Sequence, residues 1–507
     1  MIISLSVLVI TIIVSGTYAL YKAQLSKNIG VNTTTHGLAY YINYVKGTDI
    51  TAATLNPSTS YEGGASSDIE FWKKDDSYDI YGKIELTVNT IGTNLSNSPA
   101  LKYAVVNNGN VLKEGSLKGT TSGSKVTILK NLYLEQTKQI YTVYVWLDNS
   151  EELGNISNES LSISVDCTAS LQKEPTAADT IISLYTSAAK VTATNNSITY
   201  NTAPSVSLMN DRLGGTTTDL DDGNIRYYGA SPNNYIYFNC SDYSNQTSST
   251  CETWRIIGLF DGKLKLIKSE SIGAYSWDNK DTSTGAENDT GKNDWTTARL
   301  MKLLNPSNYY KVDSNDNNLG QSLYYNSASG KCYSGQNNAT VDCDFTSTGI
   351  KNAETRNMIA ETTYNLGGWN SNSVYSNQIY EYERGTTVYS GRPTTWKGKI
   401  ALAYPSDYGY AADLNQCKDK TLYDYDNRTC TSNNWMKAII TDNGSNHGWL
   451  LTPDSSYSFG AWYSHGNVGE YFTGAARGAV PVLSLSSELG IESGGDGSSS
   501  KPYKLSA

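Results

Sequence analysis

Histidine is the side chain most often used for acid–base chemistry near neutral pH, and the 507-residue sequence contains only three. His447 and His465 each precede a glycine and are expected in solvated loops, and His36 lies near the N-terminus. The sequence has no GxSxG, no HExxH and no phosphate-binding P-loop motif. A Ser-His-Asp triad stays open as an alternative, because its members need not be close in sequence. We predict no catalytic residue.

Two stretches rich in Asp and Asn, residues 278–294 and 313–317, carry the hard oxygen ligands that calcium prefers. The second stretch fails as an EF-hand loop, because Asn318 occupies its glycine position and Tyr324 its twelfth position. We interpret both stretches as solvated loop tips and predict no metal site and no cofactor. Calcium binding is the alternative.

Six of the seven cysteines form couples that are close in sequence. The couples are Cys240/Cys251, Cys332/Cys343 and Cys417/Cys430. None has the CxxC spacing of zinc or thioredoxin-like sites, which predicts three local disulfides in an oxidising compartment rather than free cytosolic thiols. Cys167 continues an alternating apolar pattern over residues 161–165, which predicts a buried free thiol.

Residues 449–485 alternate short β segments with loops rich in Ser, Tyr, Asn, Gly and Trp. Antibody binding loops use the same residue types, because rigid aromatic rings supply contact area and small polar side chains supply hydrogen bonds. The candidate ligand-binding residues are Tyr457, Phe459, Trp462, Tyr463, His465, Asn467, Tyr471 and Phe472. Strand alternation would also allow Trp462 to be buried on the side opposite Tyr463. Trp449 and Val482 are expected in the core.

The composition favours a mainly β protein, because charged residues make up only 17% and strong helix formers are scarce. Ten Trp and 39 Tyr are too many aromatic residues for a disordered chain. The net charge is −10 and no basic run occurs, which excludes nucleic acid as a partner and disfavours anionic lipid surfaces.

Residues 1–19 are predicted to be a signal peptide that is cleaved after Ala19. The apolar stretch is also just long enough for an uncleaved membrane anchor, which is the alternative. In that case the membrane would be contacted only through this segment. We expect a secreted or cell-surface protein.

The remaining chain is predicted to form two domains. Residues 20–170 read as a β-sandwich, with alternation at Ile84, Leu86 and Val88 and a hairpin turn at Asn108-Gly109. Residues 206–507 are predicted to form a larger α+β, loop-rich domain with a hairpin that turns at Asp261-Gly262.

Between these two domains, residues 171–205 are predicted to be a helix and linker. Thr176 and Asp179 have the spacing of a helix N-terminal cap, which predicts a helix over about residues 176–190. The polar stretch that follows is interpreted as a linker, or alternatively as an edge of the second domain.

Several segments carry a family resemblance. Residues 16–22 resemble the end of camelysin/TasA-type signal peptides of Gram-positive surface proteins. Residues 225–238, 254–258, 404–410 and 477–483 together resemble a family of large secreted proteins of gut Gram-positive bacteria, whose function is undefined. The C-terminal part of that family is similar to C-type-lectin-like domains of the formylglycine-generating-enzyme type, a fold also used by retroelement-diversified receptor proteins.

The resemblance implies a C-type-lectin-like binding scaffold, with variable terminal loops, over residues 206–507. It does not imply formylglycine-generating activity, because that family needs a copper-binding cysteine pair near its C-terminus and no Cys follows Cys430.

These observations predict an exported surface protein that binds a protein or glycan on another cell or host surface, without catalysis. One alternative is a subunit of an extracellular fibre, in which the segment after Ala19 donates a strand to a neighbour. The other is a secreted hydrolase, which would need convergent carboxylates or a histidine pair.

Overall fold

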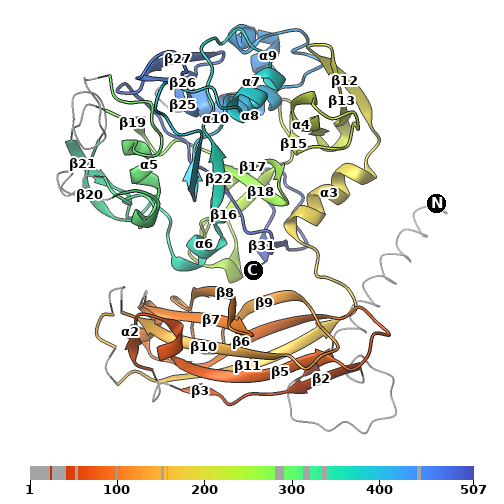
Figure 1. Cartoon of the computed structure of the whole chain (residues 1–507), viewed down its shortest axis with the longest axis vertical. Helices are drawn as coiled ribbons and strands as arrows, with labels where there is room; N and C mark the ends of the chain where they lie inside the picture. Colours follow the sequence, from red (N-terminus) through yellow and green to blue (C-terminus); the bar gives the residue numbers. More distant parts are fainter. Residues whose placement is uncertain are drawn as a thin grey trace. The chain divides into compact units, whose positions relative to one another are not determined.

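The computed structural model describes residues 23–25, 41–51, 55–98, 100–149, 153–156, 158–279, 290–311, 320–333, 340–426, 428–441 and 447–506. The chain divides into two compact units, the first formed mainly by residues up to Glu174 and the second beginning at Pro175 (Figure 1). The fold is mainly β, as the composition predicts. The predicted leader and His36 lie outside the described residues, and no helix within those residues is long and apolar enough to cross a membrane.

Two sheets of mostly antiparallel strands share one apolar core in the first unit. One sheet runs in the order β1 (Ala23–Leu25), β11 (Leu161–Ser170), β6 (Tyr81–Ile91), β9 (Lys125–Tyr133), with β3 (Ile50–Thr51) on β11. The other runs β2 (Ile42–Val45), β5 (Ala65–Lys73), β10 (Ile140–Asp148), β7 (Leu101–Asn107), β8 (Asn110–Ser116), with β4 (Pro57–Ser58) on β10 and the helix α2 (Thr93–Asn97) outside the sheet.

Local sequence signals place the strands of this unit. Ile84, Leu86 and Val88 are fully buried, as their alternation predicts. Asn108 and Gly109 join β7 to β8 with positive φ angles of 49° and 76°, a conformation that these two residue types adopt at low cost. Cys167 is a buried free cysteine, which confirms the prediction from the alternating pattern.

The second unit contains two large sheets. A nine-stranded sheet runs β12 (Val191–Asn195), β13 (Ile198–Ala203), β14 (Leu208–Asn210), β15 (Ile225–Tyr227), β17 (Glu252–Phe260), β18 (Lys263–Lys268), β29 (Val482–Ser484), β24 (Ile400–Ala401), with β16 (Tyr235–Phe238) on β17. A five-stranded sheet runs β19 (Ala274–Ser276), β28 (Ala476–Gly478), β25 (Gly448–Pro453), β26 (Gly460–Ser464), β27 (Val468–Phe472). The hairpin β17–β18 turns at Asp261-Gly262, as predicted.

Short helices and two-stranded ribbons complete the chain. The helices are α3 (Ala177–Ser187), α4 (Arg212–Gly215), α5 (Arg299–Leu304), α6 (Ala353–Met358), α7 (Ser376–Glu383), α8 (Pro405–Tyr410), α9 (Arg428–Ser432) and α10 (Trp435–Thr441). The ribbons pair β20 (Ser329–Tyr333) with β21 (Thr340–Asp344), β22 (Thr362–Asn365) with β23 (Thr395–Gly398), and β30 (Gly490–Ile491) with β31 (Leu505–Ser506).

The interpretation of residues 171–205 as a helix and linker needs correction. The predicted cap is present: Thr176 accepts a hydrogen bond from the Asp179 amide, and the Asp179 side chain accepts one from the Thr176 amide. However, α3 buries Ile181 and Tyr185 in the core of the second unit. Residues 191–203 are not a linker either, because they form β12 and β13 at the edge of the nine-stranded sheet. Edge strands carry polar residues, so composition alone does not separate them from linkers.

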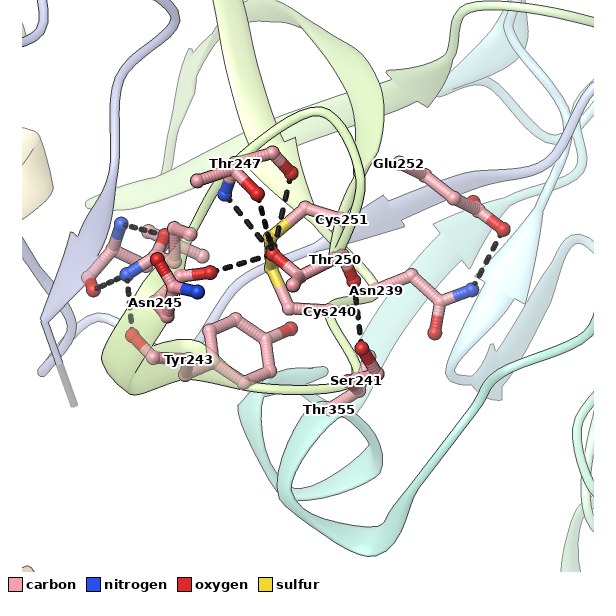
Figure 2. The surroundings of a disulfide bond; sticks show 12 residues. Asn239, Cys240, Ser241, Tyr243, Asn245, Thr247, Thr250, Cys251, Glu252 and Thr355 are labelled. Atoms are coloured by element: carbon pink, nitrogen blue, oxygen red, sulfur yellow. Dashed lines mark hydrogen bonds between the residues drawn. A yellow bond between two sulfur atoms is a disulfide. The ribbon is translucent and has the colours of Figure 1, made fainter.

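The three predicted disulfides are present: Cys240–Cys251, Cys332–Cys343 and Cys417–Cys430. Figure 2 shows the first of them, where the Thr250 hydroxyl donates to the Asn245 carbonyl oxygen at 2.6 Å inside the closed loop. The Ser241 amide donates to the Thr250 carbonyl oxygen at 2.7 Å. Each bridge closes a polar loop that has few apolar contacts of its own. Three disulfides indicate an oxidising environment.

Four buried charged side chains from separate segments meet in the second unit. Arg226 on β15 is 1% exposed, and its Nε lies 2.5 Å from Asp211 Oδ2 while its Nη1 lies 2.9 Å from Asp407 Oδ1. Lys265 on β18 also donates to Asp407. The ring centre of Phe260 lies 4.5 Å from the guanidinium carbon of Arg226, so apolar surface closes over the ions. Breaking such a pair leaves an uncompensated buried charge.

The chain between the two units is short. The Asn131 side chain binds both the amide and the carbonyl oxygen of Glu174 in the first unit. The Ala177 amide already donates to the Leu489 carbonyl oxygen in the second unit, at 2.7 Å. Limited digestion of the full chain with a broad-specificity protease is therefore expected to separate the units within residues 171–176. Each unit has its own core, so both fragments should unfold cooperatively.

Strands β12 and β13 serve as the internal comparison in this digestion. Their backbone is hydrogen-bonded into the sheet, so mass spectrometry should find residues 191–203 intact after residues 171–176 have been cut. Earlier cleavage at 191–203 would show that these strands behave as the linker and that the unit boundary is misplaced.

Candidate ligand-binding face

The predicted ligand-binding residues converge on the hairpin β26–β27 and the loop before it. Tyr463 lies opposite Gly469, and Ala461 lies opposite Tyr471, so the two tyrosines project from the same side of the hairpin. Trp462 lies opposite Glu470 and projects from the other side. We call the side of Tyr463 and Tyr471, together with Arg477 from β28, the Arg477 face.

Aromatic rings surround the guanidinium of Arg477. Its central carbon lies 3.9 Å from the ring centre of Tyr463, 4.4 Å from that of Tyr471 and 5.5 Å from that of Trp449. The rings of Tyr463 and Tyr471 meet edge to face, with centres 6.1 Å apart. A cation over ring faces is attracted by their negative quadrupole, so each contact contributes about 0.5–2 kcal/mol.

Arg477 is buried, with 8% exposure, yet no carboxylate among the described residues pairs with it. Its Nε has no hydrogen-bond partner there. Burial lowers the pKa of Arg477, and the neighbouring Tyr463 and Tyr471 only partly offset this effect. Because arginine normally neutralises its charge with a carboxylate when buried, this side chain is available to an acceptor from outside the chain.

Two histidines extend the Arg477 face. His447 directly precedes β25, and its ring centre lies 5.6 Å from that of Tyr463. His465 stacks on Tyr463 at 5.3 Å, with ring planes 23° apart, and lies 5.3 Å from His447. The face therefore combines aromatic surface with imidazole groups and a guanidinium.

The loop that carries Tyr457 is held in place by hydrogen bonds. Asp454 Oδ1 accepts from the amides of Ser456 and Tyr457, which fixes the turn. The Asn293 side-chain amide donates to the carbonyl oxygens of Asp454 and Tyr457, each at 2.8 Å. Arg392 in turn donates to Asn293 Oδ1 at 2.9 Å. Tyr457 is thus 55% exposed on an ordered support.

The eight predicted residues differ in exposure. Tyr457, His465 and Tyr471 are exposed, with Tyr471 at 42%, and Phe459, Tyr463, Asn467 and Phe472 are half-buried. Ring pairs Tyr457–Phe459 and Tyr471–Phe472 have centres 5.8 and 4.3 Å apart.

Two of these predictions need correction. Trp462 is fully buried in the core and donates from Nε1 to the Trp369 carbonyl oxygen, so it is not available to a ligand. The side-chain nitrogen of Asn467 donates to the Tyr423 carbonyl oxygen at 3.0 Å, which makes Asn467 largely a support of the β26–β27 turn.

Sequence reasoning missed Arg477 and His447 as members of the face. An arginine in the small-residue segment Ala475–Ala479 has no neighbouring acid in the sequence, which is the one local signal that could have drawn attention to it. His447 comes close to His465 only because β25 and β26 pair, with Gly448 opposite Ser464.

The hydrolase alternative required convergent carboxylates or a histidine pair. The described residues contain His447 beside His465, and also Asp454 near Glu470, where burial and the Asp454 carboxyl raise the pKa of Glu470. These pairs do not combine, because Glu470 projects with Trp462 and the histidines stack beside Tyr463 on the other side.

No group of three or more His, Cys, Asp or Glu side chains in the described ranges could hold a metal ion. Asp278 has a structural role, because it accepts hydrogen bonds from the amides of Lys292 and Arg299 at 2.9 and 3.2 Å. Its burial raises its pKa to about 7. Residues 280–289 and 312–319 of the calcium candidates lie outside the described residues, so calcium binding remains an untested alternative.

No protein-family model and no curated protein matches this sequence. The matching solved structures include a mutant of HCR/D, with 13% identity over 51% of this chain and 76% of that chain and a TM-score of 0.15. They also include the receptor-binding domain of botulinum neurotoxin mosaic serotype C/D, with 11% identity over 50% and 74% and a TM-score of 0.12. At these TM-scores the similarity supports no conclusion about fold or function.

The burial of Arg477 generates a stability prediction. Arg477→Met keeps a long flexible side chain among the rings and removes a charge whose desolvation is not compensated by a carboxylate. We expect the melting temperature to stay unchanged or to rise, as measured by differential scanning calorimetry. Residues that reduce stability in this way are typical of functional sites.

Arg255→Met is the matched control. Arg255 is also buried between rings, 3.8 Å from Tyr235 and 4.8 Å from Trp435, but it donates to Asn234 Oδ1 and to the Pro232 carbonyl oxygen. Its loss should destabilise by about 1–3 kcal/mol, because these buried acceptors lose their donor. Equal destabilisation by both variants would contradict the view that Arg477 is uncompensated.

Proposed function

We propose that this chain is an exported binding protein and that the Arg477 face of its second unit recognises a protein or glycan ligand on another cell or host surface. One observation carries the proposal: two exposed tyrosines, Tyr457 and Tyr471, stand on an ordered support beside a buried guanidinium that has no carboxylate partner among the described residues. Three disulfides support an extracellular location. The C-type-lectin-like identity of this unit belongs to the same proposal.

The chemistry of the face suits recognition. Tyrosine side chains supply contact area and lose little rotamer entropy when they bind. Arginine and tyrosine are enriched among the residues that dominate binding energy. An acceptor group on the ligand, such as a hydroxyl, carbonyl or carboxylate oxygen, would satisfy the donors of Arg477 that stay unpaired in the described structure.

The fibre alternative is favoured by one observation. β1 pairs antiparallel with β11 through only three residues, Ala23 to Leu25, at the edge of its sheet. A short edge strand of this kind is what neighbouring subunits exchange when they donate strands. We rank this alternative second, because it leaves the Arg477 face without a role.

The test is a glycan and protein array that is probed with the full chain and with its Tyr457→Ala, Tyr471→Ala double variant. Truncating hot-spot tyrosines costs about 2 kcal/mol or more each, so binding should fall at least tenfold. The melting temperature should change little, because both rings are largely exposed.

Two further variants serve as controls. Tyr78→Ala removes a tyrosine that is 44% exposed in the first unit and should leave binding intact. Val482→Asp places a charge at a fully buried position of β29 and should unfold the second unit. If the double variant binds all ligands of the unaltered chain equally well, the recognition surface lies elsewhere and the proposal fails.

A further inference from the structure

A cavity of about 120 Å³ lies in the second unit, away from the Arg477 face, between the hairpin β17–β18 and the segments β22 and α7. Water takes about 30 Å³ per molecule in the liquid, so the cavity has room for roughly four waters or one small organic molecule. Its walls include the buried rings of Tyr364, Tyr380 and Tyr404. Such a chamber of aromatic walls and a few polar groups is the usual form of a small-ligand site.

Two cationic side chains line this cavity. Lys265 is 6% exposed, and its ammonium lies 4.6 Å from the ring centre of Tyr404. The guanidinium carbon of Arg384 lies 3.4 Å from the ring centre of Tyr380. The ring contacts hold both cations at the cavity wall, where a ligand would meet them without side-chain reorganisation.

The internal partners of these cations leave donors available. Lys265 donates to Asp407, which is shared with Arg226. Arg384 donates from Nη1 to the Tyr380 carbonyl oxygen at 3.1 Å and to Glu383 Oε2 at 3.4 Å. Glu383 accepts in addition from the amide and the hydroxyl of Ser406. The guanidinium of Arg384 therefore retains N–H groups that have no acceptor within the described residues.

A third polar group points to a ligand. The Thr362 hydroxyl oxygen on β22 belongs to a residue of the cavity wall, is buried and has no hydrogen-bond partner among the described residues. Buried hydroxyls are normally hydrogen-bonded, and an orphan hydroxyl beside two cations matches an anionic acceptor. The carboxylate in the lining, Asp261, is exposed at the hairpin turn and does not neutralise the buried end.

We propose that this cavity binds a small carboxylate, whose oxygens are held by Arg384, Lys265 and the Thr362 hydroxyl. A carboxylate matches the planar fork of a guanidinium, and its size matches the cavity. A groove of about 490 Å³ beside α3 shares Asn224 and Asp261 with the cavity, so the rest of a larger acid has space to continue there.

The probe is sodium propionate, compared with the isosteric neutral propionamide at constant ionic strength. Ligand-observed saturation-transfer NMR and thermal shift of the full chain should detect propionate and not propionamide. Equal binding of the two probes, or tighter binding of sulfate than of propionate, would overturn the assignment of a carboxylate site.

Variants locate the effect. Arg384→Gln should weaken propionate binding by roughly tenfold, because a charge-assisted hydrogen bond is lost. Thr362→Val is nearly isosteric and loses no hydrogen bond seen in the described structure, so it should keep its melting temperature and still weaken binding. Lys331→Gln removes an equal charge from an exposed side chain on β20 and should change nothing.

Thr362→Val keeps the proposal falsifiable if Arg384→Gln does not fold. Unchanged propionate affinity in folded Thr362→Val and Arg384→Gln proteins would place the site elsewhere and refute the inference. Neither variant touches the Arg477 face, so loss of propionate binding is independent of the array result.

Discussion

The second unit depends on the neutralisation of Arg226. A bare charge in a protein interior costs several kcal/mol, and Arg226 is compensated by two carboxylates, Asp211 and Asp407, that lie 15 and 181 residues away. Asp407 also compensates Lys265, which lines the carboxylate cavity. The Leu451 amide of β25 donates to the Ala403 carbonyl oxygen, just before α8, and so links the sheet of the Arg477 face to the segment that carries Asp407.

The contrast between Arg226 and Arg477 separates structure from function. Both are buried and both lie against rings, but Arg226 contacts two carboxylates and Arg477 contacts none in the described ranges. A paired buried ion can be explained by the fold alone. An unpaired one reduces stability, and its retention beside exposed tyrosines is best explained by a ligand that supplies the missing acceptor. The cavity at Lys265 and Arg384 follows the same logic through the orphan Thr362 hydroxyl.

Local signals predicted local structure well. The turns Asn108-Gly109 and Asp261-Gly262, the cap at Thr176 and the three cysteine couples depend on residues that are close in sequence, and all are present. The same signals failed where tertiary packing decides. Residues 191–203 look like a linker but pair as an edge, and Trp462 looks like a contact residue but fills the core. Arg477 and the cavity cations gain their surroundings from segments far apart in sequence, which no local pattern encodes.

The most direct test of this account is hydrogen exchange of the full chain carrying Arg226→Met. Removing one partner of a buried ion pair costs about 3–5 kcal/mol, so the account predicts a large loss of amide protection in β14, β15, β18 and α8. The loss should extend to β25 through the Leu451–Ala403 bond, while the first unit keeps its protection. Unchanged protection in these elements would contradict the central claim that the buried ion network holds the second unit and its two proposed binding sites together.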